Sequence, residues 1–103
     1  MNLFNLLQVQ PDINEGLRRF HSTPEAVLLD VRSPEEYENG HLPGSMNLPL
    51  NRLAGINLGK STPLFVYCLS GARSVRACAW LERNGYKTEN IGGLTNYHGK
   101  LER

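Results

Sequence analysis

One cysteine in this chain has neighbours that suit nucleophilic chemistry. Cys68 directly follows the apolar run at residues 63–67 and precedes residues 73–84, a segment of helical composition. A thiol between a strand and a helix lies where backbone N–H groups converge and where the helix dipole favours negative charge. These conditions favour the nucleophilic thiolate. The alternative is a buried cysteine packed as a small apolar side chain, but the glycine and arginine that follow count against it.

The loop after the cysteine has a spacing that suits an anion. Four residues separate Cys68 from Arg73, and the backbone N–H groups of this loop can point inward around whatever the sulfur carries. Gly71 permits a positive φ, and Ala72 keeps the rim of the loop open. For Ser74, capping of the following helix is an equally good interpretation. We predict Cys68 as the nucleophile and, as substrate-binding residues, Leu69, Ser70, Gly71, Ala72, Arg73 and Ser74.

The elements around this loop alternate between strand and helix. Five strands are expected, at residues 6–10, 26–31, 45–47, 64–67 and 86–91. Helices are expected between them, beginning at the N-cap candidates Asp12 and Ser33, and a further helix is expected at residues 94–101. The alternation predicts an α/β domain with a mainly parallel sheet. In such sheets, functional sites lie outside the carboxyl ends of the strands.

Two charged residues end the second expected strand. Because the carboxyl ends of parallel strands meet at one edge, Asp30 and Arg32 are expected beside the reactive loop. We predict that Asp30 orients Arg73 through an ion pair. Arg32 has two interpretations of equal weight: contact with an anionic substrate, or a structural pair with Glu35 or Glu36.

Length and charge exclude several classes of partner. The chain has 103 residues and a formal net charge of +1, and we expect residues 1–103 to form a single domain. That charge provides no field for nucleic acid or for a membrane surface. The first residues carry no cationic leader, and no apolar stretch approaches the ~20 residues of a membrane span. We therefore expect a cytoplasmic protein without nucleic-acid or membrane partners.

The cysteines and histidines predict neither a disulfide framework nor a metal site. Cys68 and Cys78 are ten residues apart, and His21, His41 and His98 are scattered along the chain. Cys78 falls within the expected helix at residues 73–84, where core packing is a better interpretation than a resolving thiol. We expect no metal ion and no other cofactor.

Four ordered segments of the sequence resemble the rhodanese family of sulfurtransferases, in particular its single-domain members. The segments are residues 28–37, 40–47, 68–74 and 85–93, so the resemblance covers nearly the whole chain. It implies a rhodanese-like α/β fold, in which a five-stranded, mainly parallel sheet is flanked by helices on both faces. It also implies that the reactive cysteine lies in the loop before a helix.

The resemblance implies a two-step sulfur transfer through Cys68. The Cys68 thiolate would take a sulfane sulfur from a donor such as thiosulfate, become a persulfide, and pass the outer sulfur to a thiol or to cyanide. A thioredoxin-like or sulfur-relay protein is a candidate partner. The loop has no cation before Arg73, which leaves the choice of donor open.

Three other functions compete with that of a sulfurtransferase. A sulfur-relay module would share the chemistry and differ in its turnover with small donors. A non-catalytic rhodanese-like interaction domain is disfavoured by the intact Cys68, Gly71 and Arg73. A phosphatase or arsenate reductase is also disfavoured, because related cysteine phosphatases have a loop one residue longer, which encloses a phosphate.

Overall fold

A parallel sheet forms the centre of the structure, a computed structural model that describes residues 11–103. The strands, in the spatial order β2-β1-β3-β4, are β1 (Val27–Asp30), β2 (Ser45–Asn47), β3 (Pro63–Cys68) and β4 (Lys87–Gly93). Every neighbouring pair is parallel, as the alternation of elements predicts. The described residues contain four strands rather than the expected five. The first expected strand, at residues 6–10, lies outside the described residues.

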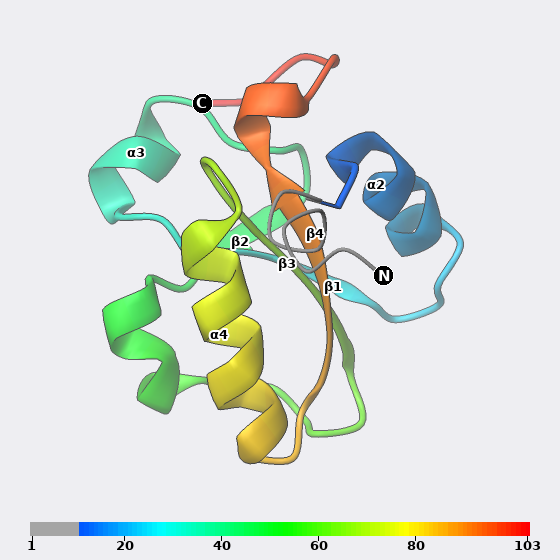
Figure 1. Ribbon diagram of the computed structural model, residues 1–103, viewed down its shortest axis with the longest axis vertical. Helices are drawn as coiled ribbons and strands as arrows, with labels where there is room; N and C mark the ends of the chain where they lie inside the picture. Colours follow the sequence, from blue (N-terminus) through cyan, green and yellow to red (C-terminus); the bar gives the residue numbers. More distant parts are fainter. Residues whose placement is uncertain (1–10) are drawn as a thin grey trace, which may run out of the picture.

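Helices cover both faces of the sheet, which confirms that expectation (Figure 1). The helix α4 (Ala72–Arg83) and the 3₁₀ helix η1 (Leu50–Gly55) lie on one face, and α2 (Ile13–His21) lies on the other. The short helix α3 (Pro34–Glu38) follows the carboxyl end of β1. No helix among residues 11–103 is both long and apolar enough to span a bilayer. The cytoplasmic location stays a prediction from the sequence.

The central strand β3 is buried on both faces. Its alternate side chains Leu64, Val66 and Cys68 belong to the core cluster beneath α4. The intervening Phe65 and Tyr67 belong to the core cluster beneath α2. This alternation is what the period of a strand dictates, and it explains why β3 reads as a continuous apolar run. It also places the Cys68 sulfur on the α4 face of the sheet.

A bulge in β4 determines which residue of β4 lies beside the end of β3. The pairing of β3 with β4 shifts between Val66 and Tyr67, and Ile91 is the additional residue on β4. The shift brings Gly93 into register with Cys68. A residue without a side chain therefore stands next to the start of the reactive loop.

Two helix starts confirm the N-cap residues expected from the sequence, Asp12 and Ser33. The Asp12 carboxylate accepts the backbone N–H of Asn14 and caps α2. At α3, Ser33 Oγ accepts the N–H of Glu36 at 3.2 Å, and Glu36 Oε1 accepts the N–H of Ser33 at 3.0 Å. This second arrangement is a complete capping box, which satisfies two backbone donors that the helix leaves unpaired.

The helix expected at residues 94–101 is shorter than predicted. Only Leu94–Asn96, named η2, is helical, and its form is a 3₁₀ turn. Glu102 instead pairs with His41 in an antiparallel bridge, with two backbone hydrogen bonds of 2.8 Å. This pairing satisfies the backbone N–H and C=O groups of His41 and Glu102.

The close approach of α2 to β4 leads to a test of packing. A Cβ added at Gly16 would lie 2.4 Å from the Ile91 Cβ and Cγ2 atoms. We expect Gly16→Ala to lower the free energy of unfolding by about 1–3 kcal/mol through overpacking, as measured by urea denaturation. In the control Gly55→Ala, the new Cβ meets no atom within 4 Å. Equal stability of the two variants would contradict this account of the α2–β4 contact.

Candidate active site

The Cys68 sulfur lies in a small cradle of donors at the start of α4. The backbone N–H of Gly71 donates to Sγ at 3.0 Å, and the N–H of Ser74 donates to it at 3.4 Å. The Ser74 hydroxyl oxygen lies 3.5 Å from Sγ. Cys68 itself is fully buried. N–H donors that converge on a sulfur stabilise negative charge on it, so the geometry of this cradle suits an anionic sulfur.

The cradle depends on the backbone conformation at Gly71. This residue is the N-cap of α4 and has a φ of 99°, a left-handed conformation that a side chain would strain. The Ser74 hydroxyl donates to the Gly71 carbonyl oxygen at 3.0 Å and closes the turn. Helix capping by Ser74 was one of its two interpretations, but Ser74 lies inside the first turn and Gly71 is the cap.

The loop also presses against the end of β4. A Cβ added at Gly93 would lie 2.3 Å from the Leu69 carbonyl oxygen and 2.7 Å from the Ser70 carbonyl carbon. The same Leu69 oxygen accepts the backbone N–H of Thr95 at 3.1 Å. The loop is therefore seated on β4 and η2 at a distance that only glycine at position 93 permits.

The rim of the loop is open although the sulfur beneath it is buried. Leu69 is 42% exposed, and Ser70 and Ala72 are also exposed. These side chains are apolar or small. The structure thus brings the expected loop residues around Cys68, with backbone N–H groups toward the sulfur and an uncharged outer edge.

Arg73 pairs with Glu36, and the predicted ion pair with Asp30 is wrong. Arg73 Nη1 lies 2.7 Å from Glu36 Oε1, and Nη2 lies 3.0 Å from Oε2, which is a two-pronged contact from α4 to α3. Both side chains are about one-third exposed. The hydrogen bonds from Arg73 lower the pKa of Glu36 from 4.5 to about 2, against the opposing effect of burial.

Asp30 is engaged by Arg32 instead. Arg32 Nη2 lies 2.7 Å from Asp30 Oδ2, and Nε lies 3.0 Å from the same oxygen. Arg32 Nη2 also donates to the Gly40 carbonyl oxygen at 2.7 Å, and the side chain is only 5% exposed. The predicted contact of Arg32 with substrate is not supported, because the guanidinium is buried in a structural ion pair. Its other predicted partners, Glu35 and Glu36, are not the ones it uses.

Glu36 is the site residue that sequence reasoning missed. Its position in the capping box explained it as a helix-start residue, and the structure gives its carboxylate a second partner, Arg73. One signal was present in the sequence: α3 begins a few residues after the carboxyl end of β1, at the edge where Cys68 also lies. A carboxylate at that edge is within reach of the arginine of the loop.

The second cysteine belongs to the core. Cys78 is 8% exposed and lies in the cluster beneath α4, and its thiol is free. Burial raises the pKa of this thiol from 9.0 to about 11, although a hydrogen bond with Thr88 acts in the other direction. Such a thiol is a poor nucleophile at neutral pH, which agrees with the interpretation of Cys78 as a packing residue.

Comparison with known proteins gives the family of this domain. Residues 14–100 match the rhodanese-like domain family, and the chain belongs to it. The fold agrees with the crystal structure of a rhodanese-like domain protein from Staphylococcus aureus, with a TM-score of 0.78 and 25% identity. That match covers 89% of this chain and 94% of the Staphylococcus chain.

Curated relatives include proteins named for sulfur chemistry. A protein of Allochromatium vinosum named sulfurtransferase is 38% identical, over 82% of this chain and 76% of its own length. The putative sulfur carrier protein YrkF of Bacillus subtilis is 33% identical, over 89% of this chain and 53% of its own length. The chain thus spans only about half of YrkF, and 65% of a further Bacillus subtilis relative, YqhL.

The Arg73–Glu36 pair should make stability depend on pH. A carboxylate whose pKa falls from 4.5 to about 2 on folding contributes stability fully above pH 4.5, and loses it as the pH falls toward 2. We therefore expect Glu36→Gln to be less stable than the wild type near neutral pH, with a difference that shrinks on acidification. Thermal unfolding across that range measures it. The control is Glu35→Gln, an exposed carboxylate without an ion pair among residues 11–103; a constant difference for Glu36→Gln would contradict the assignment.

The contact at Gly93 should control the order of the reactive loop. We expect Gly93→Ala to lower the free energy of unfolding by about 1–3 kcal/mol, because the Leu69 and Ser70 backbone must move to admit a Cβ. The rate of Cys68 alkylation by iodoacetamide should change with it, since the N–H donors belong to the same loop. The control Gly59→Ala places its Cβ 3.5 Å from the Thr62 hydroxyl. If Gly93→Ala has the same alkylation rate and the same free energy of unfolding as the wild type, this role of the contact is refuted.

Proposed function

We propose that this protein is a sulfurtransferase that carries a sulfane sulfur as a persulfide on Cys68. The observation that supports this most strongly is the pair of N–H groups, from Gly71 and Ser74, directed at the Cys68 sulfur. Donors in these positions stabilise a thiolate before transfer and a persulfide anion after it. Membership of the rhodanese-like family, and a relative named sulfurtransferase, support the same chemistry.

The transfer needs no cofactor and proceeds in two balanced steps. With thiosulfate as donor, the Cys68 thiolate forms a bond to the sulfane sulfur while the sulfur–sulfur bond of the donor breaks. Sulfite leaves with the electron pair, and Cys68 becomes a persulfide. In the second step cyanide or a thiolate bonds to the outer sulfur, the bond to Sγ breaks, and the Cys68 thiolate is restored with that electron pair.

The loop residues have separate roles in this proposal. Gly71 and Ser74 supply backbone donors to the sulfur, and the exposed Leu69, Ser70 and Ala72 form the edge that a donor or acceptor crosses. Arg73 adds positive potential beside the site, although Glu36 offsets much of it. In this proposal the thiolate attacks the donor sulfur directly, so no general base takes part.

A relay role is the second candidate, and the charge of the loop favours it. Arg73 is the cation of the loop, and its guanidinium is paired with Glu36. A site for free thiosulfate gains from unpaired positive charge, whereas a protein-bound persulfide carries less charge and needs it less. Sulfur delivered by a thioredoxin-like or sulfur-relay protein fits such a loop, and the relative YrkF is itself named a putative sulfur carrier protein.

Mass spectrometry of the intact protein tests the proposed persulfide. After incubation with thiosulfate, mercaptopyruvate or polysulfide, we expect the wild type to gain the mass of one sulfur atom and to lose it on addition of cyanide. Cys68→Ser should gain nothing. Cys78→Ser is the matched control and should load as the wild type does, because the Cys78 thiol is buried with a raised pKa. Loading that survives in Cys68→Ser, or that fails with every donor, would reject the proposal.

A further inference from the structure

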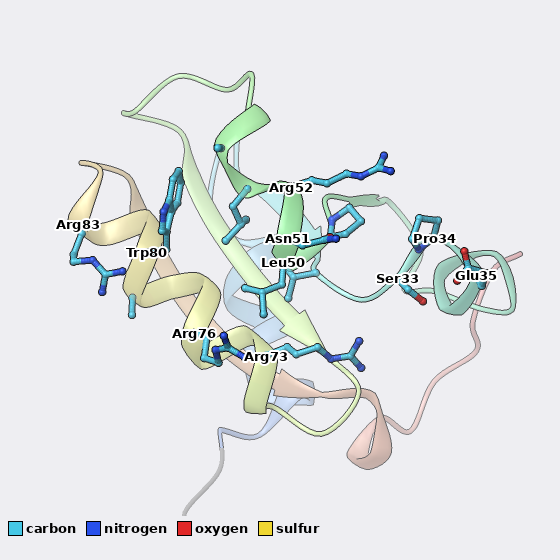
Figure 2. A pocket seen from close by; sticks show the side chains of 15 residues that line it. Ser33, Pro34, Glu35, Leu50, Asn51, Arg52, Arg73, Arg76, Trp80 and Arg83 are labelled. Carbon is cyan, nitrogen blue, oxygen red and sulfur yellow. The ribbon is translucent and has the colours of Figure 1, made fainter.

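A wide groove runs along α4 on the same face of the sheet as the reactive sulfur. Its volume is about 1000 Å³, and it lies between α4, η1 and the start of α3 (Figure 2). This is the upper end of the size range of small-molecule pockets, far more than a thiosulfate ion needs. The groove reaches Arg73 at the start of α4 and Arg83 at its end. It therefore begins beside the reactive loop and extends away from it.

The rim of this groove is basic. Figure 2 shows Arg76 and Arg83 along α4, with Arg52 on η1 across the groove. All three side chains are exposed, and none of them forms an ion pair with another of residues 11–103. Glu35 is the carboxylate that lines the groove. Because the whole chain has a net charge of only +1, this concentration of guanidinium groups is a local feature.

The floor of the groove is apolar. The lining includes the buried Val31 and Leu53 and the half-buried Leu50. Trp80 stands between α4 and η1 in Figure 2 and packs against the core cluster beneath α4. An apolar floor with a basic rim fits a segment that alternates apolar and acidic side chains.

The dimensions of the groove fit a short extended peptide. Arg73, Arg76, Trp80 and Arg83 recur at helical spacing on one side of α4. The stretch from Arg73 to Arg83 is about 15 Å long at the helical rise of 1.5 Å per residue. An extended chain covers that length in about five residues. A segment seated there would have its end next to the loop that holds Cys68.

We propose that this groove docks an acidic, partly apolar segment of the protein that exchanges sulfur with Cys68. The inference rests on the proposed sulfur transfer and names the partner's recognition surface. The carboxylates of the segment would pair with Arg52, Arg76 and Arg83, while its apolar side chains cover the floor. Charge complementarity at an open rim mainly raises the rate of encounter, as sulfur exchange between two proteins requires.

Single-stranded nucleic acid is the weaker candidate for this groove. Its bases bind by stacking on aromatic faces, and Trp80 is the aromatic residue among those that line the groove. That ring is half-buried and packed against the core. The apolar side chains of an acidic peptide can cover this floor while Trp80 stays packed against the core, so the observations favour the peptide.

The exchange with such a segment balances as the small-acceptor reaction does. A cysteine thiolate of the segment forms a bond to the outer sulfur of the Cys68 persulfide. The bond from that sulfur to Sγ breaks, Sγ keeps the electron pair as a thiolate, and the segment carries away the persulfide. The reverse step loads Cys68 from a partner persulfide.

The first experiment measures docking without the chemistry. A labelled peptide of sequence Asp-Leu-Glu-Leu-Asp-Gly-Cys, blocked at its thiol, is titrated into the Cys68→Ser variant by fluorescence anisotropy. The matched peptide carries Asn and Gln in place of Asp and Glu. We expect the acidic peptide to bind more tightly, with an affinity that falls as salt is added. Equal affinities of the two peptides would overturn the docking proposal, whether or not Cys68 transfers sulfur.

Charge reversal then locates the site. Arg76→Glu with Arg83→Glu should weaken binding of the acidic peptide about tenfold, because repulsion replaces attraction at the rim. The control Lys87→Glu with Lys100→Glu makes the same change in net charge at exposed residues that do not line the groove. Equal losses in both double variants would show a general charge effect and overturn the groove as the docking site. A single-stranded oligonucleotide could also displace the bound peptide from the groove. If the oligonucleotide binds there more tightly than the acidic peptide, the groove is a nucleic-acid site and the proposal is overturned.

The second experiment separates docking from sulfur transfer. The persulfide form of each variant is given either cyanide or the acidic peptide with a free thiol, and the two transfer rates are compared. We expect the ratio of the peptide rate to the cyanide rate to fall about tenfold in the Arg76→Glu, Arg83→Glu variant and to hold in the lysine control. An unchanged ratio would overturn docking in the groove. Failure of cyanide to remove sulfur from the wild type would reject the proposed function and leave the peptide binding to be judged by itself.

Discussion

A buried ion pair at the carboxyl end of β1 holds the edge of the sheet where the site is built. The fully buried Asp30 carboxylate accepts the backbone N–H of Arg32 at 2.9 Å as well as its guanidinium. Arg32 extends the contact to the Gly40 carbonyl, and Asn47 Nδ2 donates to the backbone oxygens of Asp30 and Arg32 at 3.0 Å. Removal of one charge would leave the other buried without a partner, a loss of about 3–5 kcal/mol. These contacts therefore hold the chain after β1, the backbone at Gly40 and the end of β2 together at this edge.

The reactive loop lies at that edge, and its function depends on backbone groups and on glycines rather than on its own side chains. Its donors are backbone N–H groups, which a sequence change alters only through the conformation of the chain. Gly71 provides the left-handed turn, and Gly93, brought beside Cys68 by the bulge in β4, leaves room for the loop. The chemistry of the sulfur is thus controlled by the path of the backbone and the register of a neighbouring strand. The charged side chains stand further out and hold this path in place.

The fold could be predicted from the sequence where the signal was local. The apolar runs, the capping box at Ser33 and the position of Cys68 between strand and helix were visible in the chain itself. The ion pairs were harder, because two acids and two bases meet at one edge and spacing alone does not pair them. Asp30 and Arg32 are two residues apart, and the bend that follows β1 turns the backbone N–H and the guanidinium of Arg32 onto the Asp30 carboxylate. The end of the chain was harder to predict, because only Leu94–Asn96 is helical and Glu102 pairs with His41, a residue far away in the sequence.

Glu36 links the first turn of α3 to the reactive loop. The same carboxylate oxygen accepts the N–H of Ser33 at the start of α3 and receives Arg73 from the reactive loop. Two equilibria that share one group are thermodynamically coupled, and the coupling acts equally in both directions. Order in the first turn of α3 therefore biases the conformation of the loop, and any anion that draws Arg73 away loosens that turn. The short helix α3, remote from the sulfur in sequence, is in this sense a reporter of the occupancy of the site.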